Sequence, residues 1–61
     1  MTRKYIYIKQ DSNLEAALEV AQSVDVWAKL DTDHNRVIRV YDYHKVAYAL
    51  ATSGIYFNGW Q

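Results

Sequence analysis

The sequence predicts an α+β fold, in which a small, mainly antiparallel sheet of three or four strands carries both helices on one face. Three segments with alternating apolar residues and two segments with helical spacing follow one another in the order β-α-β-β-α. A last aromatic segment can add a fourth strand. With that strand the order is that of the ferredoxin-like topology, which hosts many unrelated functions.

The length and composition favour one small intracellular domain. The chain has 61 residues, no cysteine, no proline and two glycines. We expect residues 1–61 to form a single compact domain, because a chain of this length holds only one core. The absence of cysteine excludes disulfides and sulfur-ligated metal sites, and it favours a reducing, cytoplasmic location. Because so small a core stabilises a fold only narrowly, the composition also favours a homodimer.

The first predicted strand covers residues 4–9, where β-branched and aromatic residues recur with a period of two. The alternation places Ile6 and Ile8 on one face of the strand and Tyr5 and Tyr7 on the other.

A helix is predicted next. Ser12 can cap it, because Glu15 stands three residues later, as in a capping box. Apolar residues at helical spacing then predict a helix that runs to about Ser23. Its apolar stripe consists of Leu14, Ala17, Leu18 and Ala21.

Two further strands are predicted at residues 24–30 and 36–41, which alternate on either side of a polar segment and so indicate a β-hairpin. The register that gathers the aliphatic side chains on one face places Trp27 opposite Arg39 on the other face.

Asp42 can cap a second helix, and Gly54 suits the left-handed residue that ends it. The apolar stripe of this helix is Tyr43, Val46, Ala47 and Leu50. Residues 55–61 are aromatic and extended, which predicts an edge strand or an arm that docks elsewhere. Asn58 and Gly59 form a turn signal within this segment.

The candidate binding site is the sheet face that the helices leave open. The residues expected to face the helices are Ile6, Ile8, Val24, Val26, Ala28, Leu30, Ile38 and Val40. Alternation then places the other strand residues on the opposite surface. These candidate partner-binding residues are Tyr5, Tyr7, Trp27, Lys29, Arg39 and Tyr41. Several large rings gathered on one surface are typical of a binding site.

Three interpretations of this face compete. The favoured one is a protein interface, with another protein or with a second copy of the chain, since Tyr, Trp and Arg dominate interface energies. The alternative is a platform for single-stranded nucleic acid, on which bases stack on the rings while Lys29 and Arg39 follow the phosphates. A net charge of zero counts against it. In the third interpretation the rings only stiffen the sheet.

No residue cluster predicts chemistry. Asp31, Asp33 and Asn35 have the spacing of a calcium loop, but Arg36 stands where such a loop needs glycine, so we expect turn formers there. No apolar stretch is long enough for a membrane span or a signal peptide. We therefore expect no enzyme activity, no catalytic residues, no metal, no cofactor and no membrane partner.

The predicted function is that of a small non-enzymatic protein-binding module, which acts by covering a surface of a larger macromolecule. An analogy of size with the accessory proteins of phages suggests an inhibitor or modulator of a host macromolecule.

Overall fold

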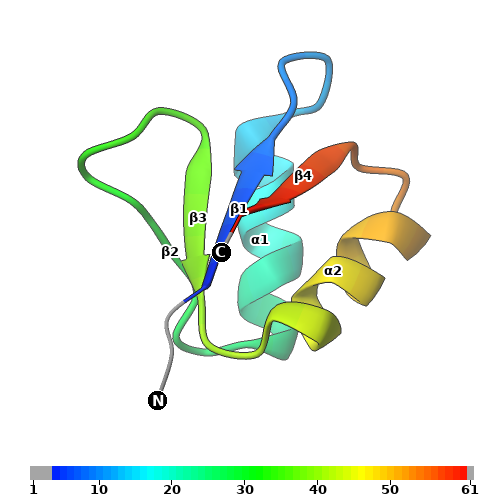
Figure 1. Ribbon diagram of the computed structural model, residues 1–61. Coiled ribbons are helices and arrows are strands. Elements are labelled where there is room, and N and C mark those ends of the chain that lie inside the picture. The colour runs from blue at the N-terminus through cyan, green and yellow to red at the C-terminus, as the bar shows by residue number, and fades with distance from the viewer. Residues whose placement is uncertain (1–3, 61) are drawn as a thin grey trace.

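The computed structural model describes residues 4–60, which form two helices and four strands (Figure 1). In chain order the elements are β1 (Lys4–Ile8), α1 (Leu14–Val24), β2 (Lys29–Leu30), β3 (Val37–Val40), α2 (Tyr43–Thr52) and β4 (Phe57–Trp60). The predicted α+β class is confirmed, and the C-terminal aromatic segment forms the fourth strand.

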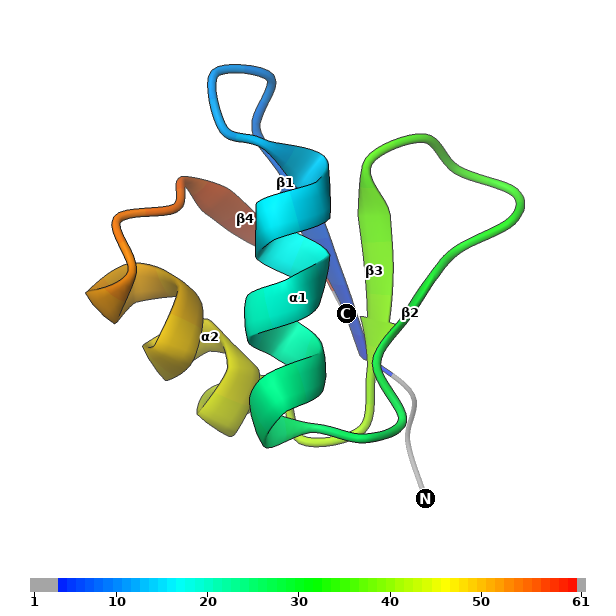
Figure 2. The same ribbon diagram turned by 180° about the vertical axis from the view of Figure 1, so that it is seen from behind.

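The sheet has the order β2-β3-β1-β4, and each pair of neighbouring strands is antiparallel. The β-α-β-β-α-β succession, with β1 and β3 in the centre, is that of the ferredoxin-like topology. Both helices lie on the same face of the sheet (Figure 2), so the fold has two layers and leaves the other sheet face without a helix.

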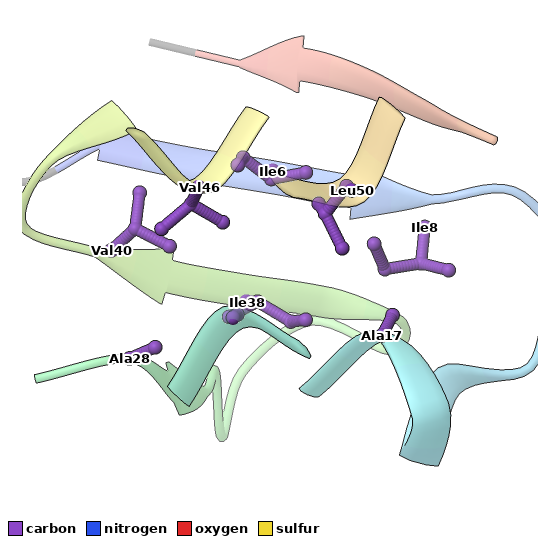
Figure 3. Packing of buried hydrophobic residues seen from close by; sticks show 9 residues of the cluster. Ile6, Ile8, Ala17, Ala28, Ile38, Val40, Val46 and Leu50 are labelled. Carbon is purple, nitrogen blue, oxygen red and sulfur yellow. The ribbon is translucent and has the colours of Figure 1, made fainter. Parts of the chain in front are cut away.

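The core lies between the sheet and the two helices (Figure 3). Its buried residues are Ile6, Ile8, Ala17, Ala21, Ala28, Ile38, Val40, Val46 and Leu50. Helix α1 contributes only alanines to the fully buried set, and these small side chains let its backbone approach the sheet closely. Each fully buried isoleucine or leucine contributes about 1.5–3 kcal/mol, so a few large side chains supply most of the stabilisation.

Helix α1 begins one residue later than the capping box predicts. Its N-cap is Asn13, whose Oδ1 accepts a 3.0 Å hydrogen bond from the amide of Ala16. The hydroxyl of Ser12 instead accepts a 2.8 Å bond from the amide of Tyr56, 44 residues along the chain. The predicted Ser12 cap is therefore wrong, because a long-range bond uses the Ser12 side chain.

Strand β2 is much shorter than the sequence predicts. Of residues 24–30, only Lys29–Leu30 pairs with β3. The predicted register is also wrong by two residues, because Lys29 instead of Trp27 lies opposite Arg39.

Two residues of the predicted core face are consequently misplaced, and a third, Leu30, keeps the predicted face opposite Ile38 but is not buried. Val24 belongs to helix α1, where it packs against the edge of the core. Val26 lies in the turn before β2 and is exposed, and Leu30 is exposed at the outer strand of the sheet. The chain turns here because Asp25, directly after the helix, accepts hydrogen bonds from the amide of Trp27 through its side chain and from the amide of Ala28 through its carbonyl.

Helix α2 follows the prediction. Asp42 is its N-cap, and Oδ1 of Asp42 accepts a 3.2 Å bond from the amide of Lys45. Val46 and Leu50 are buried in the core. Gly54 has a φ of +74°. This left-handed conformation commonly ends helices, and glycine adopts it without the steric strain that a Cβ would cause.

The predicted turn at Asn58 and Gly59 is absent, since both residues lie inside β4 and pair with β1. Glycine suits position 59 for a packing reason. A Cβ there would lie 1.8 Å from the hydroxyl oxygen of Tyr43, so the phenol of α2 rests against the bare backbone of β4.

Candidate functional site

The six candidate residues divide into two groups. Four of them lie in or beside the strands at positions that alternate with the buried residues, and so they share the sheet face without helices: Tyr5, Tyr7, Lys29 and Arg39. Trp27 lies in the connection from α1 to β2, and Tyr41 lies in the connection from β3 to α2. The structure therefore does not gather all six on the sheet face.

Three of the strand residues form a row across the sheet. Arg39 lies opposite Lys29 on one side and opposite Tyr5 on the other. Lys29 is exposed, whereas Arg39, Tyr5 and the neighbouring Tyr7 are half-buried. The rings on this face are thus partly covered, in contrast to the open aromatic surface that the sequence predicts.

An acidic residue sits beside this row. Oδ1 of Asp31 lies 3.8 Å from Nε of Arg39, and Oδ2 of Asp31 lies 2.6 Å from Nδ1 of His34. Val37, on the same face, is only 2% exposed. The carboxylate offsets the positive charge of Arg39, which weakens the attraction that this face would exert on phosphate.

Three exposed apolar or aromatic residues lie in connections at one end of the sheet. Val26 is 83% exposed, Trp27 67% and Tyr41 50%. We call these three residues the apolar end surface. They come from two connections that meet at the same end of the molecule (Figures 1 and 2).

A buried carboxylate holds the two connections together. Asp25 is 5% exposed, and its Oδ1 accepts a 3.0 Å hydrogen bond from the amide of Trp27. Its Oδ2 accepts bonds from the amides of Tyr41 at 2.6 Å and Asp42 at 3.1 Å. Three hydrogen bonds from backbone amides satisfy the buried carboxylate, which would otherwise be costly to bury. Asp25 therefore holds the backbones of Trp27 and Tyr41 close together.

Sequence reasoning missed this arrangement because the segment around Asp25 alternates like a strand. A signal was present, since aspartate is unfavourable inside a strand and its side chain readily bonds the amide two residues later. That bond is the one from Trp27 to Asp25. The partnership with Tyr41 has no local signal, because it joins residues 16 positions apart.

Other parts of the described chain offer little chemistry. Within residues 4–60, no three His, Asp or Glu side chains come together in a way that could hold a metal ion. His44 is exposed, and its ring lies edge-on to the ring of Tyr43 with 5.5 Å between the ring centroids. A surface depression after α2 has lining residues that are apolar apart from Tyr56: Ala51, Gly54, Ile55, Tyr56 and Phe57. No helix in residues 4–60 is both long enough and apolar enough to cross a membrane.

Comparison with protein-family models finds no match, and comparisons with curated proteins and with solved structures find none either. The fold defines the class of the molecule, a small α+β protein with the ferredoxin-like strand order.

Proposed function

We propose that the chain is a small non-enzymatic protein-binding module, and that its apolar end surface is the anchor for a larger protein. The observation that carries the proposal is the joint exposure of Val26, Trp27 and Tyr41 on two connections that Asp25 ties together. Exposed apolar side chains gathered in one place mark partner sites more often than scattered ones do.

The residue types and their rigidity support a protein partner. Trp and Tyr are enriched among the residues that dominate protein interfaces. The backbones of Trp27 and Tyr41 are already held by hydrogen bonds to Asp25, so little backbone ordering would be required on binding. Lys29 and Asp42 are exposed and lie within two residues of the apolar end surface in the sequence, so they provide both signs of charge at its rim.

The mode of action that fits this surface is steric blocking. A chain of 61 residues with a rigid apolar anchor would cover a site on a larger host macromolecule and inhibit or modulate it, in the manner of small phage accessory proteins. The lack of cysteine favours the cytoplasm as the place of action.

A single-stranded nucleic-acid platform is the second candidate. The row of Lys29, Arg39 and Tyr5 favours it, because two cations there adjoin a ring. The Asp31 carboxylate near Arg39 and the net charge of zero disfavour it.

The experiment uses random-peptide binders selected on the wild-type protein. Trp27→Ala should weaken their binding about 30-fold, which corresponds to ~2 kcal/mol for an anchor residue. Tyr48→Ala is the matched control, because Tyr48 is a comparably exposed aromatic residue that belongs to α2 and not to the apolar end surface, and its loss should leave binding unchanged. Binders that tolerate Trp27→Ala would contradict the proposal.

The same proteins are then titrated with a fluorescent mixed-sequence single-stranded oligonucleotide at low salt. Salt-sensitive binding that Arg39→Ala removes and Trp27→Ala retains would establish the second candidate instead.

A further inference from the structure

The outer edge of β4 has backbone groups directed away from the sheet. The amide of Lys9 donates to the carbonyl of Tyr56 at 3.1 Å, and the β1–β4 pairing continues with Tyr7 opposite Asn58. In an antiparallel ladder, hydrogen-bonded and non-bonded pairs alternate. The backbone N–H and C=O groups of Asn58 therefore point toward β1, and those of Phe57 and Gly59 point outward.

The two edges of the sheet differ in how they are protected. The β2 edge is two residues long, and the neighbouring Ala28 already uses both backbone groups: its amide donates to the carbonyl of Asp25, and its carbonyl accepts from Nε2 of Gln22. Strand β4 is four residues long and contains no charged residue and no proline. Charges, proline and short length are what proteins use to prevent edge pairing, so the β4 edge is the unprotected one.

We propose that β4 pairs with β4 of a second copy of this chain, antiparallel about a two-fold axis at Asn58. Phe57 then lies opposite Gly59 of the second copy, and the same pair recurs on the other side of the axis. The outward groups of these residues form four backbone hydrogen bonds between the two copies. The product is one continuous eight-stranded sheet, and this inference goes beyond the proposed function.

Charge and shape make a second copy the fitting occupant. From residue 43 to residue 60, the only Asp, Glu, Lys, Arg or His residues are His44 and Lys45, which belong to the first turn of α2 and not to β4. An uncharged edge is complementary to itself, since no like charges meet across the axis. The Tyr43 hydroxyl covers the backbone of Gly59, so Phe57 of the second copy would meet an aromatic ring there.

The dimer would also place the two apolar end surfaces at opposite ends of the joined sheet, because antiparallel pairing reverses the direction of the second copy. A dimer could then bind two partner molecules, or one partner at two sites with increased avidity.

The test is sedimentation equilibrium of the full chain at concentrations up to about 1 mM, which detects even weak dimers. Wild type should dimerise, and Asn58→Lys and Asn58→Asp should each weaken the dimer at least about tenfold, because like charges then face each other across the axis. An equimolar mixture of the two variants should regain dimerisation. Asn58→Gln is the uncharged control and should behave as wild type.

A second readout is amide hydrogen exchange at low and high protein concentration. The amides of Phe57 and Gly59 should exchange more slowly at high concentration, and circular dichroism should show that every variant remains folded. A monomer at every concentration, or a dimer that neither Asn58→Lys nor Asn58→Asp weakens, would overturn the proposal. A dimer that Trp27→Ala disrupts would instead assign self-association to the apolar end surface.

Discussion

The backbone amide of Tyr41 donates a 2.6 Å hydrogen bond to Oδ2 of Asp25, a residue 16 positions earlier in the chain. This bond joins the connection after α1 to the connection before α2. Because Asp25 also accepts from the amides of Trp27 and Asp42, one buried side chain fixes the backbone of the two connections that carry Trp27 and Tyr41. The Asp25 side chain therefore contributes to the stability of the fold and also positions the backbone of the candidate site.

Asp25→Ala should lower the free energy of unfolding by about 2–4 kcal/mol, because it leaves three backbone amides without their acceptor at a buried position. Asp25→Asn should cost less, since one oxygen acceptor remains. Urea denaturation followed by circular dichroism measures both. Asp33→Asn, a substitution in the exposed hairpin loop, serves as the control and should change stability by less than about 0.5 kcal/mol. Equal stability of Asp25→Ala and wild type would show that the three bonds contribute nothing.

Gly59→Ala should destabilise the protein by about 1–3 kcal/mol, because the new methyl group overlaps the Tyr43 phenol. Tyr43→Phe removes the nearest atom, the hydroxyl oxygen, but leaves the ring carbon that lies 2.7 Å from the Cβ position. The double variant should therefore recover only part of the loss. A double-mutant cycle, measured at concentrations where the protein is monomeric, should give a coupling energy above about 0.5 kcal/mol. Additive effects would mean that the two positions are independent.

Ser12 and Asn13 should affect different amides. Asn13→Ala removes the cap of α1, which should cost about 1 kcal/mol and speed hydrogen exchange of the Ala16 amide. Ser12→Ala removes the acceptor of the Tyr56 amide and should speed exchange there while Ala16 stays protected. Site-resolved exchange by NMR separates the two effects. Faster exchange of the Glu15 amide in Ser12→Ala would instead support the Ser12 cap that the sequence predicts.

Elements specified by local signals were predictable from sequence. The Asp42 cap and the Gly54 stop act within one or two helical turns, so their residue types alone indicate the bounds of α2. The alternation of Ile6 and Ile8 similarly fixes which face of β1 is buried, because a strand has a period of two.

The candidate site was less predictable, because it depends on contacts between distant residues. Val26 and Trp27 alternate with their neighbours as strand residues do, but in the structure they lie in a turn, which the bonds from Tyr41 and Asp42 to Asp25 hold beside the β3–α2 connection. A local pattern contains no information about those partners. The shared sheet face of Tyr5, Tyr7 and Arg39 was predicted correctly, since it follows from alternation within single strands.

Arg36 occupies a left-handed backbone conformation, with a φ of +62°, at the end of the loop before β3. Its guanidinium compensates for this strain by holding the β1–α1 connection: Nε donates to the carbonyl of Ile8 at 2.8 Å and Nη2 to that of Lys9 at 2.6 Å. A further bond runs from Nη2 to the carbonyl of Ser12. The left-handed conformation costs a residue with a Cβ roughly 1–2 kcal/mol relative to glycine.

Arg36→Ala and Arg36→Gly separate these two contributions. Both variants lose the three bonds and should be less stable than wild type, because hydrogen bonds from a charged donor contribute about 1.5–3 kcal/mol each when well formed. Arg36→Gly should nevertheless be more stable than Arg36→Ala by about 1 kcal/mol, since glycine adopts positive φ without strain. Thermal and urea unfolding of the three proteins give this order. If Arg36→Ala proved as stable as Arg36→Gly, position 36 would not be under strain, and if both matched wild type, the guanidinium bonds would not stabilise the fold.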